Sequence, residues 1–574
     1  MKKYIPLALF GLLCLGASAF GFYSSAGKSF SLDETDLATR AHMINAAGPR
    51  GPELYYGQGN GEAVPHPPMY DYALALVFRL FGETEIAARS FGVFCFILVG
   101  ILTALSVGEF LKNEDRKQRN LAVFFGVCLY LVNPLLIQHS MLIDADAAFT
   151  FLFLNLFAYV YIRFENRSPS PPAGRYLILA GLFALVCLSK EGTPFLAAAG
   201  AAGYRVLGRQ WKKMLTEFLF IFVLGAVFAW GAWLLFCHAT GIDAMIFLRQ
   251  QYAFRVSRPG TWEFFMRVLK NIPLILRWPV FWVSPAFFVL LFLCLARNAG
   301  EFMKNKKWEL CDFYFLTGLA VWVPYFFVKP SVDMMKYQHP VYPLFIAAMA
   351  AVFSRVFKKK EPPPVFFILL AAAACFYYYK LGDPLLLLMY PEKNTGWFEF
   401  LARYGWPMVA AAAAALAYRL FRGKSLWEGI AFASVFFIFP VNIALDIRQT
   451  EPYTTAESWL NYGEKGLKET VDHLARRIHG EAPSVLRKDL VYYLQFRRGV
   501  SVSKNRNPNY LLRDQPLPEA VRDYLAQPSE YVVLDRVVIT SNPLLKIVGK
   551  KIFANYALEK KFGNFSVLRL KEKI

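Results

Sequence analysis

Three carboxylates stand close together after the first apolar run, in the sequence Ser31-Leu32-Asp33-Glu34-Thr35-Asp36. A carboxylate at a membrane surface can take the proton of an attacking hydroxyl or amine, or it can bind a cation. The same residues also match a helix cap, because Glu34 follows Ser31 by three positions and acids favour the first helical turn. Both interpretations are compatible, since a capped helix would hold Asp33 rigidly, with Asp36 on its face and Glu34 pointing elsewhere.

A second acidic pair, Asp144 and Asp146, interrupts apolar residues between two predicted membrane spans. Ionisable residues at the boundary of a span are costly and are functional candidates, although a solvated loop is the plain alternative. Residues two apart on a helix point in nearly opposite directions, so a site built from both requires a non-helical backbone. Together with His66 the pair are candidates for binding an acceptor or a divalent metal ion, which the spacing alone does not establish. A similar break at Lys190-Glu191 is interpreted as structural.

Basic residues gather in two segments that the topology below places outside the membrane. One segment carries Arg255 and Arg258 among aromatic residues, and the other carries Lys336 and His339. Cations beside aromatic rings near the lipid headgroups suit a lipid-linked phosphate or pyrophosphate. Anchoring to the anionic headgroups of membrane lipids is the alternative.

The elements that must position these residues are membrane helices. The chain of 574 residues is 56% hydrophobic and only 18% charged. Its net charge of +21 comes mainly from Lys and Arg in short loops between apolar runs, which indicates topology and not a nucleic-acid partner. The 8 cysteines lie in or at the ends of apolar runs without metal-ligand spacing, so we expect no disulfide framework.

About thirteen apolar runs are long enough to be transmembrane helices. They lie near residues 4–23, 87–111, 120–137, 146–162, 175–189, 193–208, 215–237, 279–297, 311–328, 340–357, 364–380, 405–420 and 425–445. Alternate loops are rich in Lys and Arg, which predicts a cytoplasmic N-terminus and a C-terminus outside. The first run is either an uncleaved span or a signal peptide cut after Ala17-Ser18-Ala19, and in both cases the next segment lies outside.

Two outside segments are large enough to carry their own structure. Within the first outer loop, 24–86, residues 69–82 have the spacing of a helix that lies in the membrane interface. The tail, 446–574, is hydrophilic and predicts a small soluble α/β domain after an all-α polytopic membrane domain over 1–445. The elements expected in the tail are a helix within 455–478 and strands at 531–534 and 565–568.

Four short motifs, each weak alone, occur in a specific order and topology. They are Asp33-Glu34 in the first outer loop, Pro67-Pro68 before a segment ending Leu80-Phe81-Gly82, Asp144 or Asp146 entering the fourth span, and Lys336-Tyr337-Gln338-His339-Pro340-Val341-Tyr342-Pro343 starting a late span. By these motifs, residues 1 to about 360 resemble the GT-C class of membrane glycosyltransferases. The resemblance is to bacterial relatives of dolichyl-phosphate-mannose protein mannosyltransferases and to the lipid A aminoarabinose transferase. His66 departs from the pattern, because several relatives have Lys there.

The resemblance implies a GT-C fold in a bacterial inner membrane, with an active site on the periplasmic side. It implies a polyprenyl-phosphate-linked sugar as donor, a lipid, glycan or protein as acceptor, and inversion at the anomeric carbon. The catalytic pair would be Asp33-Glu34, with Asp33 as the base. The cations implied at the donor phosphate are Arg255 or Arg258, Lys336 and His339.

Two other functions remain open at this point. A lipid or solute transporter or flippase would place ionisable residues near the membrane midplane and show repeated halves, whereas here they gather at one face. An O-antigen ligase or polymerase would share the lipid-linked donor and the outside site. It would use a diphosphate-linked chain and an Arg-rich outer loop, and would have no need of Asp33-Glu34.

Overall fold

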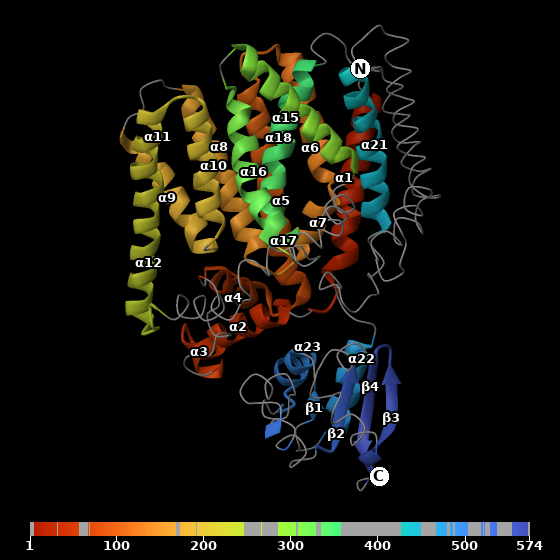
Figure 1. Cartoon of the computed structure of the whole chain (residues 1–574). Coiled ribbons are helices and arrows are strands. Elements are labelled where there is room, and N and C mark those ends of the chain that lie inside the picture. Colours follow the sequence, from red (N-terminus) through yellow and green to blue (C-terminus); the bar gives the residue numbers. More distant parts are fainter. Residues whose placement is uncertain are drawn as a thin grey trace. The chain divides into compact units, whose positions relative to one another are not determined.

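The structure is a computed structural model of the chain (Figure 1). It describes residues 5–30, 33–56, 67, 69–167, 173–190, 192–245, 266, 285–305, 308–328, 335–356, 426–448, 466–478, 483–485, 488–502, 518–519, 522, 529–535 and 554–571. The chain forms two compact units. The first comprises Met1–Ala26, Glu53–Gly82 and Ile86–Glu451, and the second comprises Gly27–Pro52, Glu83–Glu85 and Pro452–Ile574.

The first unit is a bundle of apolar helices that overlap the predicted spans. The main ones are α1 (Ile5–Ala26), α5 (Glu85–Phe110), α6 (Arg116–Leu131), α8 (Phe151–Arg167), α9 (Ala173–Ser189), α10 (Thr193–Leu207), α12 (Leu224–Thr240), α15 (Pro285–Asn305), α16 (Leu310–Val328), α18 (Tyr342–Val356) and α21 (Leu426–Arg448). However, α12 begins at Leu224 instead of 215, and α15 ends at Asn305 instead of 297. The spans predicted at 364–380 and 405–420 lie outside the described residues.

Length and apolarity allow several of these helices to cross a membrane without a break. Among the described residues, four stretches qualify, namely Ile5–Ala26, Glu85–Phe110, Ala147–Arg167 and Trp211–Thr240. A fifth is the pair of α6 and α7 (Pro134–Met141), which is bent by 55°. The helical, multi-pass architecture predicted for this unit is confirmed, while the count of thirteen spans stays a prediction.

The bend between α6 and α7 has a local cause in the sequence. Asn133 stops the first helix and caps the second, because its side-chain oxygen accepts a hydrogen bond from the Leu136 N–H at 3.2 Å. Pro134 then occupies the first position of α7, where its missing N–H costs nothing. The new helix runs only to Met141, and a π-helix, η2 (Asp146–Thr150), leads from the next turn into α8. This break places acidic residues at the end of a helix rather than inside one.

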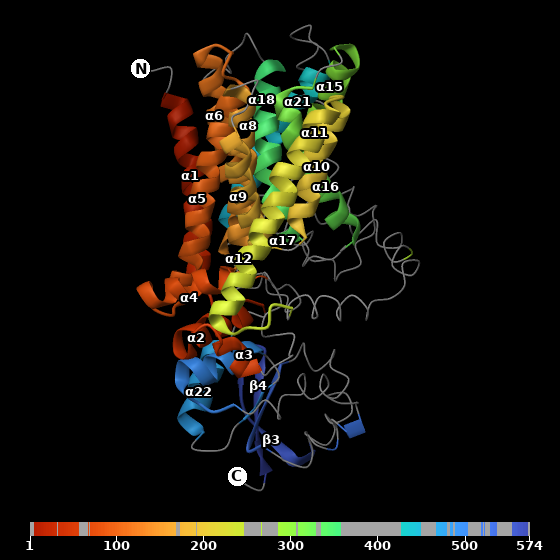
Figure 2. The ribbon, with the colours of Figure 1, turned by 90° about the vertical axis from the view of Figure 1, so that its left-hand side faces the viewer.

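Small residues let the helices of the bundle approach closely. A Cβ on Gly200 of α10 would lie 2.5 Å from the Thr317 Cα of α16, and the two helices lie side by side (Figure 2). Likewise, a Cβ on Gly225 of α12 would lie 2.7 Å from the Ala180 carbonyl oxygen of α9. Such contacts are typical of membrane helices, where close backbone packing replaces the hydrophobic driving force.

The helix expected near 69–82 is present as α4 (Met69–Phe81). One face is buried, with Tyr70, Leu74 and Phe78 at four-residue spacing, while Leu80 on another face stays exposed. This two-faced pattern fits the predicted interfacial helix.

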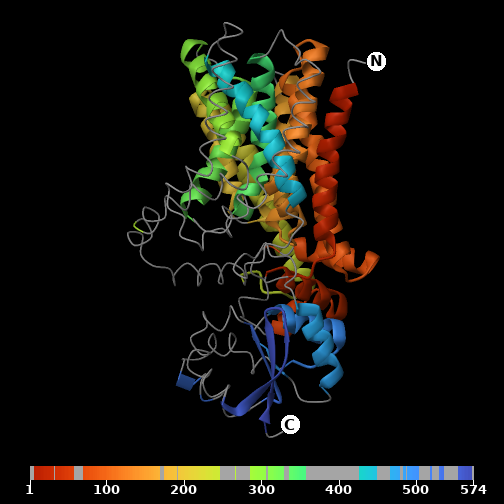
Figure 3. The same cartoon turned by 90° about the vertical axis from the view of Figure 1, so that its right-hand side faces the viewer.

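The second unit combines helices with a four-stranded sheet of order β1-β2-β4-β3 (Figure 3). The strands are β1 (Ser484–Val485), β2 (Tyr531–Asp535), β3 (Tyr556–Phe562) and β4 (Phe565–Leu570), and the helices of the tail are α22 (Leu467–Arg477), α23 (Lys488–Tyr492) and the π-helix η6 (Tyr493–Arg497). β1 and β2 pair parallel, and the other pairs are antiparallel.

Strands were expected at 531–534 and 565–568, and β2 and β4 occupy these positions. Of the helix predicted within 455–478, α22 is present in the structure. Residues 455–465 lie outside the described residues.

One helix of the first outer loop also belongs to the second unit. It is α2 (Asp33–Ala47), although the sequence analysis assigned the whole of 24–86 to the membrane domain. The reason for the difference is that α2 buries Leu37, Ala38 and Ala41 and contacts α23 of the tail. A contact between segments so far apart leaves no local pattern in the sequence.

Gly466, just before α22, makes a testable contribution to the stability of the second unit. Its φ is +99°, and a Cβ there would lie 2.1 Å from the Phe562 carbonyl oxygen. We expect Gly466→Ala to cost more than the roughly 1–2 kcal/mol of left-handed strain alone, because a backbone clash is added. Gly499→Ala is the control, since its φ is +67° with nothing within 4 Å. Thermal unfolding of the purified chain, followed by proteolysis of the tail, measures both, and equal midpoints would contradict the expectation.

Candidate functional site

Two breaks in the helices of the first unit bring polar residues to one end of neighbouring helices. Asp144 lies in the turn between α7 and η2, and Lys190 lies between α9 and α10. The Thr150 hydroxyl of η2 donates a hydrogen bond to the Ser189 hydroxyl at 3.1 Å, which joins the two breaks. A short helix, α17 (Met335–Gln338), and the 3-10 turn η5 (His339–Val341) pack against η2. Segments about 190 residues apart in sequence, Asp144 and His339 among them, are thereby gathered at one place.

A buried lysine packs against two tyrosines there. The Lys190 side chain is buried, and its Nζ lies 5.1 Å from the centroid of the Tyr337 ring. That ring stacks on Tyr325 of α16 with centroids 5.2 Å apart and an interplanar angle of 15°. The Tyr325 hydroxyl lies 3.4 Å from the Thr193 hydroxyl oxygen at the start of α10. The face of the aromatic ring attracts the cation and helps to hold the ammonium at this position.

Two histidines lie side by side next to this lysine and its tyrosines. His139 of α7 and His339 of η5 are each 0% exposed, and their ring centroids are 5.4 Å apart. Phe151 stacks on His339 at 4.1 Å. The turn that carries His339 is fixed by Asn155, whose Nδ2 donates to the Pro340 carbonyl oxygen at 2.9 Å.

We name this group the Lys190–His339 cluster; its members are His139, Asp144, Lys190, Tyr325, Tyr337 and His339. A buried cation with imidazoles and phenols in apolar surroundings attracts an anion strongly, because water screens little there. Lysine and histidine are also suitable donors to a phosphate oxygen. The cluster therefore has the chemistry of an anion site with one carboxylate, Asp144, close by.

The structure unites some of the predicted site residues in this cluster. Asp144 and His339 both belong to it. Lys336 lies in α17, three residues before His339, and Asp146 is the first residue of η2. Leu142 ends α7 in an extended conformation with φ −71° and ψ 136°, but Ala145, which lies between the two aspartates, is helical with φ −59° and ψ −38°. The non-helical backbone that a site shared by Asp144 and Asp146 would require is therefore not found at Ala145.

Other predicted site residues lie elsewhere. Asp33 begins α2 in the second unit, and the adjacent Glu34 is 1% exposed there. Arg255, Arg258 and His66 lie outside the described residues.

A metal centre finds no support within the described part of the chain. No group of three or more His, Cys, Asp or Glu side chains there could hold a metal ion. The divalent ion suggested for Asp144 and Asp146 therefore lacks a third protein ligand of these types among the described residues.

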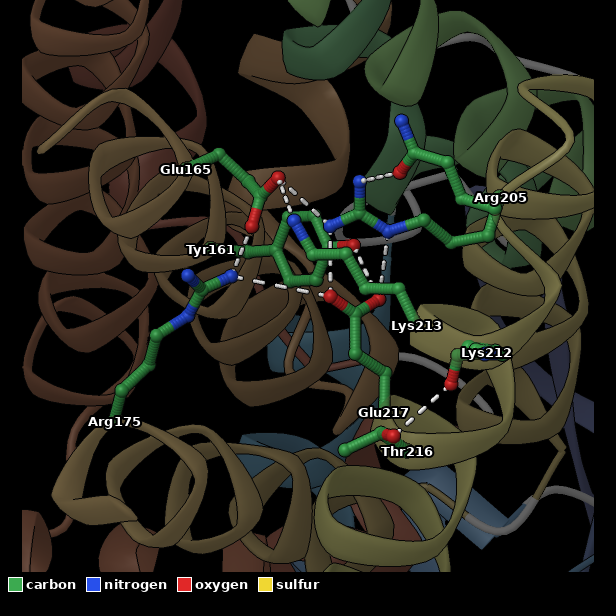
Figure 4. A network of polar contacts seen from close by, with 9 residues as sticks. Tyr161, Glu165, Arg175, Arg205, Lys212, Lys213, Thr216 and Glu217 are labelled. Carbon is green, nitrogen blue, oxygen red and sulfur yellow. Dashed lines mark hydrogen bonds and ion pairs between the residues drawn. The ribbon is translucent and has the colours of Figure 1, made fainter. Parts of the chain in front are cut away.

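A second polar group of the first unit lies at the opposite ends of the same helices (Figure 4). Arg205 of α10 donates to both carboxylate oxygens of Glu217, from Nε at 2.9 Å and from a terminal nitrogen at 2.7 Å. Glu165 of α8 receives Arg205 at 2.9 Å and Lys213 at 2.7 Å, and it also pairs with Arg175. α9 thus begins beside this network at Arg175 and ends at the Lys190–His339 cluster.

A buried tyrosine also takes part in the network. The Tyr161 hydroxyl donates to Glu217 at 2.7 Å, and the guanidinium of Arg205 lies 5.4 Å from the Tyr161 ring centroid. Buried ion pairs with this many mutual hydrogen bonds fix the positions of the helices that carry them. We therefore assign the network a structural role.

Comparison with known proteins bears on this arrangement. Residues 65–234, which include Asp144 and Lys190, match the model of the family described as dolichyl-phosphate-mannose-protein mannosyltransferase. Among solved structures, ArnT from Cupriavidus metallidurans bound to undecaprenyl phosphate matches with a TM-score of 0.58 and 13% identity, covering 97% of each chain. The apo state of the same protein matches with a TM-score of 0.53 and 15% identity, again over 97% of each chain. No curated protein sequence matches the chain.

The fold is that of ArnT over nearly the whole chain, and the family match covers the part of the cluster that comes from α7, α9 and the start of α10. The chain thus has the fold of the GT-C class of membrane glycosyltransferases, and residues 65–234 match the mannosyltransferase family model. The resemblance and the fold class predicted from the motifs are thereby confirmed.

Sequence reasoning missed part of the cluster. It treated Lys190-Glu191 as a structural turn, although Lys190 is buried beside Tyr337. The available signal was the one used for Asp144, an ionisable residue at the boundary of a span. His139 carried no comparable signal, because a lone histidine near the end of an apolar run is usually a core residue.

Lys190→Met tests whether the cluster serves the reaction. The substitution removes the cation and keeps a side chain of similar length, so we expect transfer to fall about 100-fold, as when one stabilising donor is lost. Lys190→Arg should retain part of the rate. The readout is the initial rate of glycan formation, measured by mass spectrometry, after induction in a deletion strain at matched protein level. Lys213→Met, which removes a half-exposed cation at the opposite helix ends, is the control, and equal rates for both methionine variants would refute the assignment.

Glu217→Gln tests the structural role of the network. It leaves Arg205 buried with one carboxylate fewer, so we expect a loss of about 3–5 kcal/mol of stability, as for other broken buried pairs. The control is Thr216→Val on the same helix, which removes only an exposed hydrogen bond to the Lys212 carbonyl oxygen. Thermal melting in detergent measures both variants. A Glu217→Gln protein that melts like the control would show that the network contributes little.

Proposed function

We propose that this chain is a glycosyltransferase that moves a sugar from a polyprenyl-phosphate donor to an acceptor on the periplasmic face of a bacterial inner membrane. The observation that carries the proposal is the Lys190–His339 cluster, a buried cationic site at helix ends, of which His139 and Lys190 lie within the family-matched residues. ArnT, whose fold the chain shares, is seen with undecaprenyl phosphate bound. A lipid phosphate of this class has the charge that the cluster is built to receive.

The placement outside follows from the charge of the two ends of the bundle. The network lies next to the predicted cytoplasmic loops 163–175 and 205–213, which are rich in Lys and Arg. The Lys190–His339 cluster lies at the other ends of α9 and α10, so it faces outside when the N-terminus is cytoplasmic.

On the donor side, the phosphate would lie against Lys190, with Lys336 and Arg255 or Arg258 as further cations. As the bond from the anomeric carbon to the phosphate oxygen breaks, both bonding electrons stay with the phosphate. Cations that are already in place stabilise this charge in the transition state without reorganisation. The lipid tail would remain among the apolar helices.

On the acceptor side, Asp33 would act as the general base in the Asp33-Glu34 pair. It takes the proton of a hydroxyl or amine on a lipid, glycan or protein, and the freed electron pair attacks the anomeric carbon from the face opposite the phosphate. A single displacement of this kind inverts the anomeric centre and needs no protein nucleophile. Asp144, Asp146 and His66 are the candidates for orienting the acceptor.

Asp33→Asn provides the direct test of the base. The amide cannot accept the proton, so we expect transfer to fall by at least about 100-fold, the lower range of general-base contributions. Binding of undecaprenyl phosphate to the purified protein, followed by native mass spectrometry, should stay within about twofold. Asp36→Asn is the matched control, because it removes the same charge one turn along α2. Near-normal glycan formation by the Asp33→Asn strain would refute the assignment.

A further inference from the structure

The tail of the second unit forms a hydrogen bond to the chain just before α2. The Phe30 N–H donates a hydrogen bond to the Tyr493 hydroxyl oxygen at 2.7 Å, across 463 positions in sequence. That hydroxyl in turn donates to Glu85 Oε1 at 2.7 Å. The Phe30 side chain is 0% exposed and its ring lies 5.6 Å from Tyr492. A backbone amide and a carboxylate are thus joined through one buried phenol.

A second contact of the same kind lies farther along α2. The Tyr492 hydroxyl donates to Glu83 Oε1 at 2.6 Å. The other carboxylate oxygen of Glu83 lies 2.7 Å from His42 Nδ1, and the His42 ring packs on Phe496 at 4.7 Å. Two neighbouring tyrosines of the tail therefore hold α2. Tyr493 acts just before the helix begins, and Tyr492 acts through Glu83 at His42, nine residues after the first residue of the helix.

Both phenols are suited to this donor role. Burial, and then the neighbouring Glu85 carboxylate, raise the pKa of Tyr493 above its usual value. Burial and Glu83 do the same to the pKa of Tyr492. Each hydroxyl therefore keeps its proton and points it at a carboxylate, which leaves the oxygen lone pairs of Tyr493 for the Phe30 amide.

We propose that Tyr493 is a positioning residue of the transferase, which holds the start of α2 and thereby the carboxylate of Asp33. Asp33 begins α2 only three residues after Phe30. The inference rests on the proposed function, in which Asp33 is the base. This inference gives the tail a role in catalysis. Holding the base in place matters because an error of about 1 Å in the position of a catalytic group can cost about 100-fold in rate.

Tyr493→Phe tests the positioning, with Tyr556→Phe as its matched control. Tyr556 is a buried tyrosine of the same unit whose hydroxyl donates to the Ser529 carbonyl oxygen at 2.7 Å, so both variants remove one buried, hydrogen-bonded phenol hydroxyl. In the full-length protein in nanodiscs, hydrogen exchange of the peptide that contains Phe30 should speed up in Tyr493→Phe only. The initial rate of glycan formation in the deletion strain should fall at least tenfold in Tyr493→Phe and less than twofold in Tyr556→Phe.

A double variant separates positioning from a general loss of stability. Asp33→Glu moves the carboxylate by one methylene. If Asp33→Glu and Tyr493→Phe displace the same group, the fold loss of rate in the double variant should be smaller than the product of the two single losses. Independent, multiplicative losses would overturn the positioning role, as would equal exchange at Phe30 in both phenylalanine variants.

The failure of this inference differs from the failure of the proposed function. An active Asp33→Asn enzyme overturns the function, and with it the statement that Tyr493 positions a base. An inactive Asp33→Asn enzyme together with a Tyr493→Phe enzyme as fast as Tyr556→Phe overturns the positioning role alone.

Discussion

Charges inside an apolar helix bundle must find partners, and this constraint organises the first unit. At one end of α9 and α10, Arg175 and Arg205 meet Glu165 and Glu217 in ion pairs supported by hydrogen bonds. Such a network holds its helices together because removing any member would leave another charge buried and uncompensated. At the other end, Lys190 lies on an aromatic face, which attracts a cation through the charge distribution of the ring. The same helices thus carry an ion-pair network at one end and, at the other, the cluster that we propose binds a ligand anion.

The difference between the two ends follows from how the helices stop. Where α8, α10 and α11 (Trp211–Glu217) run on in regular or nearly regular turns, their long side chains reach one another across the bundle. Where α7 and α9 stop early, backbone turns carry the polar groups instead, and η2, α17 and η5 fill the gap with short, irregular helices. Irregular backbone at this depth is tolerated when it is buried in protein or lines a cavity. The Lys190–His339 cluster therefore lies where regular structure is interrupted.

The sequence predicts the regular part of this arrangement well. Apolar runs place α9 over 175–189 and the structure has Ala173–Ser189, because a run of that composition is stable only as a helix when surrounded by lipid. The strand at 531–534 was equally visible, since its β-branched and aromatic residues are typical of a buried strand. By contrast, the stacking of His139 on His339 joins residues 200 positions apart. The local sequence pattern does not indicate such a contact. Of the two histidines, only His339 was therefore a candidate site residue from the sequence.

The first outer loop is a second case in which the local sequence predicts a helix but not its packing partner. Composition indicated that Asp33-Glu34 begins a helix, and α2 does begin there, because acids in a first turn favour the helix dipole. Composition did not indicate which fold buries that helix. Its partner is a tail whose own sequence contains no motif of an enzyme, only Tyr492 and Tyr493 at the junction of two short helices. A hydroxyl 463 positions away holds the backbone that leads into α2. In the positioning role that we propose for Tyr493, the tail would serve the enzyme through geometry alone, without contributing a reactive group.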